Sequence, residues 1–433
     1  MRVKGNLENA INKLKNDQNN AVAQVFKYQE HKEGLLKDVV FTIKENYAFG
    51  NFVTTASSNF LSNFRTFYQA DALKLLFEQG ACAVAKVHCD EFALGGSGTH
   101  SVKGIIRNPF DLRRYAGGSS SGSAATFDKN ISFALASDTG DSVRLPAANV
   151  GAVGFKPSYG AISRFGLFAY ASSLDTVAYF THNVADAQFL TKILFQKSNN
   201  DLTQKQVETQ ATFQKPSKIL IWDMSSIITS YMSSTINNLV KKLKKEGILV
   251  DFLQPCEDMV NAIKPVYEII SFSEASSNLA NLNGIAFGNR VEEGNCWKDM
   301  FISSRKLGLG KMVQRRLTLG SLFLKKENQQ DLFLRAAKVR RLYKNYINSL
   351  FEKYEFIIYP ASAGVAAKFE EKAKNNYSEW ILTGSNLVGN PSISLPIATY
   401  KNLPYSIAID APLYQDAKLL EFAKYIEKMI GDK

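Results

Sequence analysis

The stretch ISFALASDTGDSVRLP, residues 131–146, joins a mostly apolar run to a turn that contains Ser142. The run over residues 131–136 predicts a strand, because a short continuous apolar run is typical of a strand buried in a sheet. Glycine and aspartate within residues 137–142 predict a turn. A polar group next to the end of a buried strand is held rigidly, so the hydroxyl of Ser142 is a candidate reactive group.

Strand-like and helix-like segments alternate along the rest of the chain. Compact apolar runs predict strands over residues 39–43, 81–87, 219–222, 356–359 and 392–396. Helical periodicity and composition predict helices over residues 72–78, 236–243, 332–350 and 419–430. This alternation predicts an α/β fold with helices on both faces of the sheet.

The chain contains no internal repeat and no low-complexity tract, so we expect one domain over residues 1–433. Leu7, Ile11 and Leu14 share one helical face, and residues 1–32 are therefore predicted to form a short N-terminal helical arm. Residues 197–216 are polar and turn-rich. A more variable region on the substrate side is expected over about residues 197–330.

The composition is that of a soluble globular protein, with 45% apolar and 21% charged residues. No run of about 18 apolar residues predicts a membrane span, and residues 1–30 lack the apolar stretch of a secretory signal. A cytoplasmic location without membrane association follows as the expectation. The four cysteines and four histidines lack metal-ligand spacing, so no metal site is expected.

The formal charge is +12, which favours a polyanionic partner such as nucleic acid but also fits a generally basic background. Lysines 241, 242, 244 and 245 lie on the polar side of one predicted helix, and residues 332–350 form a second basic helix. A solvated helix face is favoured over an RNA-binding stripe at both places. Charge alone therefore does not assign a partner.

Two further segments carry groups that could act with Ser142. Lys44 directly follows the strand predicted over residues 39–43, and Ser119 lies in the Gly/Ser loop of residues 117–123. Taken singly, each feature is weak, because such a lysine is usually a surface residue and such a loop is usually a flexible connection. The loop lacks the Gly-Lys-Ser/Thr ending of a phosphate-binding loop.

Serine chemistry supplies a reason to combine the three segments. A serine hydroxyl is a poor nucleophile until a base takes its proton, and no histidine lies in the serine-rich segments. A buried lysine can act as the base, because desolvation disfavours the ammonium form. A second serine can relay the proton, and the N–H groups of the turn can stabilise a developing oxyanion.

The three segments together resemble the amidase signature family. The resemblance rests on Lys44 after a strand, on Gly-Gly-Ser-Ser at 117–120, on Asp-Thr-Gly-x-Ser-x-Arg-x-Pro-Ala at 138–147 and on residues 154–160. It implies an α/β/α fold around a large mixed sheet. It also implies that Ser142 is the nucleophile, that Ser119 is the bridging serine after a cis peptide bond, and that Lys44 is the base. The residues it assigns to the oxyanion hole are Thr139, Gly140 and Asp141.

Additional segments resemble the A subunits of glutamyl-tRNA(Gln) amidotransferases, among them residues 90–93, 163–167, 171–175, 274–279, 315–320 and 386–391. The resemblance implies a glutaminase subunit of a carbon–nitrogen ligase that supplies ammonia within a three-subunit complex. The implied partners are the B and C subunits, with glutamine as substrate and Glu-tRNA(Gln) handled through the complex. No cofactor is expected on this chain, whereas ATP and magnesium are expected in a partner subunit.

The resemblance assigns four residues to substrate binding, namely Arg316, Glu379, Ser97 and Gly98. Arg316 is implied to bind the α-carboxylate of glutamine through a bidentate contact, although it could equally be a helix-surface charge. Some positions depart from the family pattern, because Asp141 and Ser121 replace glycines, Leu282 replaces a tyrosine and Glu379 replaces an aspartate. Two alternatives stay open: a free-standing amidase for another carboxamide, and a catalytically weak scaffold subunit.

Overall fold

The computed structural model describes residues 1–292, 296–372 and 375–431. Its main sheet consists of β1 (Val22–Tyr28), β2 (Val40–Lys44), β3 (Cys82–Val87), β6 (Phe133–Asp138), β7 (Val153–Lys156), β8 (Thr176–Thr181), β9 (Lys218–Trp222), β10 (Leu249–Leu253), β11 (Ile357–Pro360), β12 (Ser392–Tyr400) and β13 (Leu403–Asp410). A separate hairpin consists of β4 (Arg107–Asn108) and β5 (Asp111–Tyr115).

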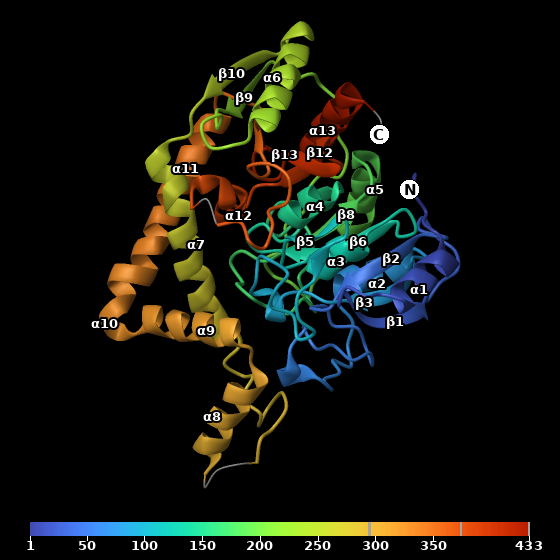
Figure 1. The fold of residues 1–433 in the computed structure, drawn as a ribbon, viewed down its shortest axis with the longest axis vertical. Coiled ribbons are helices and arrows are strands. Elements are labelled where there is room, and N and C mark those ends of the chain that lie inside the picture. The colour runs from blue at the N-terminus through green and yellow to red at the C-terminus, as the bar shows by residue number, and fades with distance from the viewer. Residues whose placement is uncertain (293–295, 373–374, 432–433) are drawn as a thin grey trace.

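The helices lie on both sides of this sheet and along one flank (Figure 1). They are α1 (Leu7–Lys15), α2 (Asp71–Glu78), α3 (Ser121–Thr126), α4 (Arg144–Val150), α5 (Val184–Leu194), α6 (Ser230–Lys245), α7 (Glu257–Asn278), α8 (Trp297–Gly308), α9 (Lys311–Leu324), α10 (Lys326–Gln329), α11 (Arg335–Phe351), α12 (Thr383–Val388) and α13 (Asp416–Ile430). Within the described ranges, no helix is long and apolar enough to cross a membrane.

The main sheet is mixed, with the strand order β1-β3-β2-β6-β8-β7-β12-β13-β11-β9-β10. The strand β2 pairs in parallel with both β3 and β6, whereas the central strands from β6 to β11 pair antiparallel. Parallel strands bring their carboxyl ends to the same edge of a sheet. The ends of β2 and β6 therefore lie together, and this edge is the place where the predicted reactive residues meet.

Helices cover both faces of the sheet, as predicted. Along β6, Phe133 and Leu135 belong to a core cluster that includes buried residues of α2, α5, α6 and α13. The alternate residues Ala134 and Ala136 pack with α3 and α4 on the opposite face. Successive side chains of a strand point to opposite faces, so these two clusters define the α/β/α layers.

The N-terminal segment differs from the expected helical arm over residues 1–32. The helix α1 forms where Leu7, Ile11 and Leu14 predict it, but residues 22–28 form β1, which pairs antiparallel with β3. This pairing satisfies backbone groups of β3 that would otherwise be exposed at a sheet edge. The expected loop over residues 117–123 is likewise shorter than predicted, because α3 begins at Ser121.

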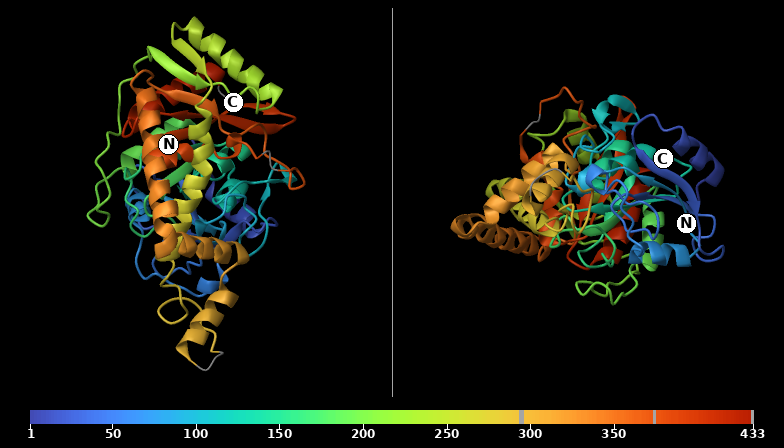
Figure 2. Two further views of the ribbon diagram at one scale, coloured as in Figure 1. Left: turned by 90° about the vertical axis from the view of Figure 1, so that its left-hand side faces the viewer. Right: turned by 90° about the horizontal axis from the view of Figure 1, so that it is seen from below.

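The segment from residue 197 to residue 330 begins, as expected, with a stretch free of helices and strands over residues 197–216. It then adds β9, α6 and β10 to one end of the molecule (Figure 1). The long helices α7 and α11 run side by side along one flank (Figure 2), and α9 packs against α7. This arrangement places residues of α7 and α9 opposite the turn that follows β6.

Candidate active site

Lys44 reaches the serine segments because it ends β2, next to the carboxyl end of β6. Its Nζ lies 2.8 Å from the Ser119 Oγ, 3.0 Å from the Ser137 Oγ and 3.3 Å from the Ser137 carbonyl oxygen. The Lys44 side chain is completely buried. The structure thus joins two of the three predicted reactive residues directly.

The environment of Lys44 favours a neutral amine. Burial lowers the pKa of Lys44 below its ordinary value, and Cys89 and the carboxylates of Asp138, Asp90 and Asp175 offset this effect only in part. The Lys44 amine forms hydrogen bonds with hydroxyl and carbonyl oxygens rather than with a carboxylate. An uncharged Nζ can accept a proton from the Ser119 hydroxyl, which is the role of a general base.

Ser119 and Ser142 lie in adjacent segments. The peptide bond between Gly118 and Ser119 is cis, as the family resemblance implies. The Ser120 N–H donates to the Ser142 carbonyl oxygen at 3.3 Å, so the two segments touch. Ser142 is 4% exposed, and its hydroxyl forms no hydrogen bond with another described residue. The structure therefore brings the two serines together without a hydrogen bond between their hydroxyls.

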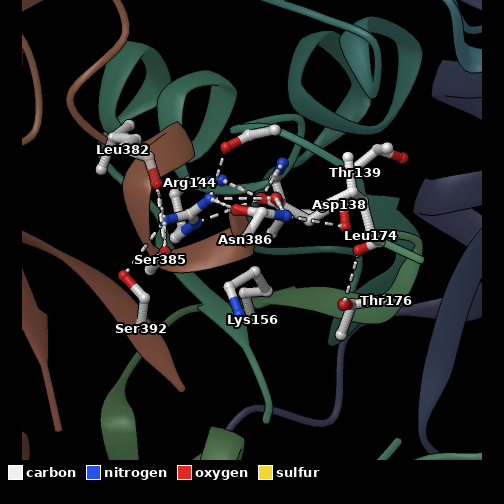
Figure 3. Close-up of polar contacts among 12 residues, drawn as sticks. Asp138, Thr139, Arg144, Lys156, Leu174, Thr176, Leu382, Ser385, Asn386 and Ser392 are labelled. Atoms are coloured by element: carbon white, nitrogen blue, oxygen red, sulfur yellow. Dashed lines mark hydrogen bonds and ion pairs between the residues drawn. The ribbon is translucent and has the colours of Figure 1, made fainter. Parts of the chain in front are cut away.

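The turn that carries Ser142 is held by a buried ion pair. Arg144 and Asp138 lie 3.0 Å apart, and both side chains are completely buried. The Asp138 Oδ2 also accepts from the Val143 N–H at 2.9 Å, and Asn386 donates to the Asp138 Oδ1 at 2.9 Å (Figure 3). Burial alone raises the pKa of Asp138, but Arg144, together with Lys156 and the Val143 N–H, outweighs this effect and holds the pKa below its ordinary value.

The Arg144 guanidinium connects the turn to the C-terminal part of the sheet (Figure 3). It donates to the Gly140 carbonyl at 2.8 Å, the Asn386 Oδ1 at 2.6 Å, the Leu382 carbonyl at 2.8 Å and the Ser385 Oγ at 2.6 Å. A buried charge is tolerated where it is paired and its donors are satisfied. Arg144 therefore fixes the conformation of the turn without contacting the reacting atoms.

Replacing Arg144 by methionine is expected to lower the free energy of unfolding by about 3–5 kcal/mol, because Asp138 is left as an unpaired buried charge. Urea unfolding at neutral pH measures this change. The matched control is Arg113→Met, since Arg113 pairs with Asp111 but its side chain is 78% exposed. Equal unfolding midpoints for the two variants would contradict a structural role of the buried pair.

The predicted oxyanion residues present unused donors. Among the described residues, none accepts a hydrogen bond from the backbone N–H groups of Thr139, Gly140 and Asp141. The Thr139 hydroxyl donates to the Asp175 Oδ1 at 2.7 Å, which fixes the start of the turn. Burial raises the pKa of Asp175 to about 6. N–H groups held in a fixed turn are suited to stabilise a developing negative charge.

A pocket of about 190 Å³ opens beside this turn. Arg316 lines it and is anchored there, because its guanidinium donates to the Leu94 carbonyl and to the Tyr170 hydroxyl and stacks over the Phe272 ring at 4.9 Å. Arg316 is therefore more than a charge on a helix surface. The full lining consists of Gly95, Gly96, Gly140, Asp141, Lys264, Tyr267, Glu268, Arg316, Glu379, Trp380 and Thr383.

The other residues predicted to bind substrate lie at different places. Glu379 is exposed at the rim of this pocket and accepts from the Asn375 N–H at 3.1 Å. Ser97 lines an adjoining cavity of about 580 Å³, which shares Gly96 and Glu379 with the smaller pocket. Gly98 is buried and lines neither cavity.

The backbone N–H groups of Ser97 and Gly98 are already engaged. They donate to the Asp90 Oδ2 at 3.2 Å and 3.0 Å, and these bonds fix the loop of residues 95–98. Leu282, which replaces a tyrosine of related chains, is 7% exposed and packs in the hydrophobic core. Neither Gly98 nor Leu282 is positioned to contact a ligand in the 190 Å³ pocket.

The pocket contains residues that the sequence did not identify. Lys264, Tyr267 and Glu268 come from one face of α7, and Trp380 precedes α12. A Cβ atom on Gly140 would lie 3.0 Å from the Tyr267 ring, so the tight approach of α7 favours glycine at this position. The spacing of the three α7 residues indicates a shared face. It does not indicate which turn that face meets.

The class of the site follows from its chemistry. A buried lysine bonded to a serine, a second serine on a turn with free N–H groups, and a polar pocket beside them are the parts of a serine hydrolase that uses lysine as its base. Across the described ranges, no group of three or more His, Cys, Asp or Glu side chains is placed to hold a metal.

Comparisons with known proteins agree with this class. The family model Amidase matches residues 4–420. The chain is 33% identical over 422 residues to the A subunit of the glutamyl-tRNA(Gln) amidotransferase of Sulfolobus acidocaldarius, which covers 94% of this chain and 88% of the relative. It is 35% identical over 418 residues to the corresponding protein of Pseudothermotoga lettingae, covering 92% and 88%. The chain belongs to the amidase family and, within it, groups with the A subunits of glutamyl-tRNA(Gln) amidotransferases.

Solved structures show the same relationship. The crystal structure of the A subunit of the Thermotoga maritima glutamyl-tRNA(Gln) amidotransferase is similar with a TM-score of 0.79 and 30% identity, covering 98% of this chain and 91% of that one. A peptide amidase from Stenotrophomonas maltophilia has a TM-score of 0.75 at 22% identity, with 92% and 83% covered. The second likeness concerns the fold alone.

Proposed function

We propose that this chain is the glutaminase subunit of a glutamyl-tRNA(Gln) amidotransferase and releases ammonia from glutamine. The observation that carries the proposal is the 2.8 Å hydrogen bond between the buried Lys44 amine and Ser119, next to the segment of Ser142. The similarity to A subunits over most of the chain supports the choice of glutamine among carboxamides.

The proposed reaction uses the two serines and the lysine in sequence. Lys44 takes the proton of Ser119 while Ser119 takes that of Ser142, and the Ser142 Oγ attacks the side-chain amide carbon of glutamine. The N–H groups of Thr139, Gly140 and Asp141 stabilise the oxyanion. The C–N bond then breaks, and the proton held by Lys44 returns through Ser119 to the leaving nitrogen. Ammonia departs, and water hydrolyses the glutamyl ester on Ser142.

The pocket beside the turn is the proposed binding site for the α-carbon groups of glutamine. Arg316 supplies the cation for the α-carboxylate, because a guanidinium can form two parallel hydrogen bonds with a carboxylate. Glu379 at the rim adds a negative charge to the entrance of this pocket. Residues 197–330 would contribute much of the substrate side of this single domain, since Lys264, Tyr267 and Arg316 all come from it.

Replacing Arg316 by alanine is expected to raise the KM for glutamine by about 10- to 100-fold, which corresponds to one charge-assisted hydrogen-bonded contact. The turnover number changes less, because Arg316 does not touch the amide group. Steady-state glutaminase kinetics measure both values. Arg315→Ala is the matched control, since the neighbouring Arg315 is exposed and does not line the pocket. An unchanged KM in Arg316→Ala would remove Arg316 from the substrate site.

The proposed setting is a cytoplasmic complex with the B and C subunits. One of these partners would use ATP and magnesium to activate Glu-tRNA(Gln), and ammonia from this chain would convert it to Gln-tRNA(Gln). The four cysteines are free thiols, which fits a reducing compartment. No cofactor on this chain is needed for the proposed glutamine hydrolysis, because lysine and serine supply the base and the nucleophile.

Reconstitution tests the proposed function. The purified chain is assayed for ammonia release from glutamine, alone and with the B and C subunits, Glu-tRNA(Gln), ATP and magnesium. We expect release to rise in the assembly and Gln-tRNA(Gln) to form. Equal release by the chain alone, with turnover of other carboxamides, would identify a free-standing amidase. Complete absence of release in the assembly would identify a scaffold subunit.

A further inference from the structure

Asp141 places a carboxylate beside the proposed nucleophile. It directly precedes Ser142 and lines the 190 Å³ pocket together with Arg316. The family resemblance gives this position to glycine, so the side chain is an addition of this chain. Its carboxylate accepts no hydrogen bond from another described residue.

The neighbouring carboxylates have their acceptors occupied. Asp90 accepts three backbone N–H groups, Asp138 is paired with Arg144, and Asp175 accepts from the Thr139 hydroxyl and two backbone N–H groups. Asp141 is the exception within this group of four. The Asp141 side chain lines the pocket without a protein donor, so a cationic ligand in the pocket can supply the contact that the other three carboxylates already have.

The charged groups around Asp141 are of both signs. Burial, reinforced by Asp138, raises the pKa of Asp141 to about 7, while Arg144 and Arg316 favour the charged form. On α7, the Lys264 Nζ lies over the Trp380 ring at 5.2 Å. Glu268 and Glu379 add negative charge to the lining. The pocket therefore presents Arg316 and Lys264 as cations together with the carboxylates of Asp141, Glu268 and Glu379.

We infer that the Asp141 carboxylate binds the α-ammonium group of the substrate and thereby selects amides of α-amino acids over amides that lack this group. The inference rests on the proposed function and extends it. Glutamine carries an anion and a cation on one carbon, so a pocket with Arg316 and Asp141 offers a counter-charge for each. Glu379 is exposed at the rim, where solvent weakens its attraction.

The inference predicts how the site rejects analogues. An amide without the ammonium group would enclose Asp141 without its counter-charge, and a site built around a polar contact strongly rejects a substrate that lacks it. The probe is 5-amino-5-oxopentanoate, which has the carboxylate and the amide of glutamine but hydrogen in place of the α-ammonium group. In the assembled wild-type complex we expect glutamine to be preferred.

Asp141→Asn is expected to lower kcat/KM for glutamine by about 10- to 100-fold, mainly through KM, which corresponds to one lost hydrogen bond to a charged group. The value for the analogue should stay constant or rise, so the preference collapses. Asp141→Gly introduces the glycine that related chains have at this position, and it should abolish the preference as well. Asp258→Asn, at an exposed site on the same helix as Lys264, is the control and should retain the preference.

Equal losses of kcat for both substrates in Asp141→Asn, without a change in KM, would overturn the inference and assign Asp141 to the turn instead. Equilibrium binding of glutamine and of the analogue to the Ser142→Ala chain tests the role of Asp141 without requiring glutamine hydrolysis. If Ser142→Ala prefers glutamine to the analogue, and Ser142→Ala with Asp141→Asn does not, Asp141 recognises the ammonium group even without wild-type turnover. An unchanged preference in the double variant would overturn the inference even if wild-type hydrolysis is observed.

Discussion

Replacing Ser142 by alanine is expected to lower glutamine hydrolysis by about 10⁴- to 10⁶-fold, because no other group can form the glutamyl ester. The hydroxyl lies on a turn fixed by the Asp138–Arg144 pair, beside N–H groups that are free to bind an oxyanion. The assay follows ammonia release from glutamine in the assembled complex. Activity within about 10-fold of wild type would remove Ser142 from the reaction.

Two controls show that this loss is specific. With ammonium salt in place of glutamine, Ser142→Ala should still support formation of Gln-tRNA(Gln), because the partner subunit then receives its nitrogen directly. Ser121→Ala removes a hydroxyl from the same loop region as Ser119, and the buried Ser121 Oγ has no hydrogen-bond partner in the structure. It should retain glutamine hydrolysis. If Ser142→Ala formed no Gln-tRNA(Gln) with either glutamine or ammonium salt, the substitution would have disrupted the complex.

Replacing Lys44 by methionine is expected to lower glutamine hydrolysis by about 100- to 10,000-fold, which is the usual contribution of a general base. Methionine fills a similar volume but cannot accept the proton of Ser119. In the wild type, activity should fall as the pH drops through the lowered pKa of Lys44, because the protonated amine cannot act as a base. A pH–rate profile measures this limb, and a flat profile from acidic to alkaline pH would contradict the role of Lys44.

The stability of Lys44→Met distinguishes lost chemistry from lost structure. The folded-state pKa of Lys44 lies below the unfolded value, so the unfolded chain binds more protons between these two values and stability rises with pH there. At neutral pH the buried lysine therefore opposes folding, and the unfolding midpoint of Lys44→Met should equal or exceed that of the wild type. Lys86→Met is the matched control, because Lys86 is also buried but bonds to Val53 and Thr54. It should retain glutamine hydrolysis.

The sequence was informative where the site depends on strand ends. The apolar runs before Lys44 and before the Ser142 turn predict β2 and β6, and their parallel pairing brings Lys44 to Ser137 at the start of that turn. Residues on the predicted helices followed the expected periodicity as well. This success has a local physical cause, because a buried strand and the turn after it are encoded within about ten residues.

The lining of the pocket depends on contacts between distant segments and could not be predicted in the same way. Tyr267 approaches Gly140 from 127 positions along the chain, and Asn386 reaches Asp138 across 248 positions. Helical spacing identifies a shared face but not the element it meets. The family resemblance assigned Ser97 and Gly98 to substrate binding, but their N–H groups donate to Asp90 instead.

Covalent trapping of Ser142 tests the central claim most directly. The assembled complex is treated with a serine-reactive electrophile derived from glutamine, and peptide mass spectrometry locates the added mass. The account predicts one label on the peptide that contains Ser142, slower labelling in Lys44→Met, and none at this position in Ser142→Ala. A label on a different residue, together with continued ammonia release by Ser142→Ala, would contradict it.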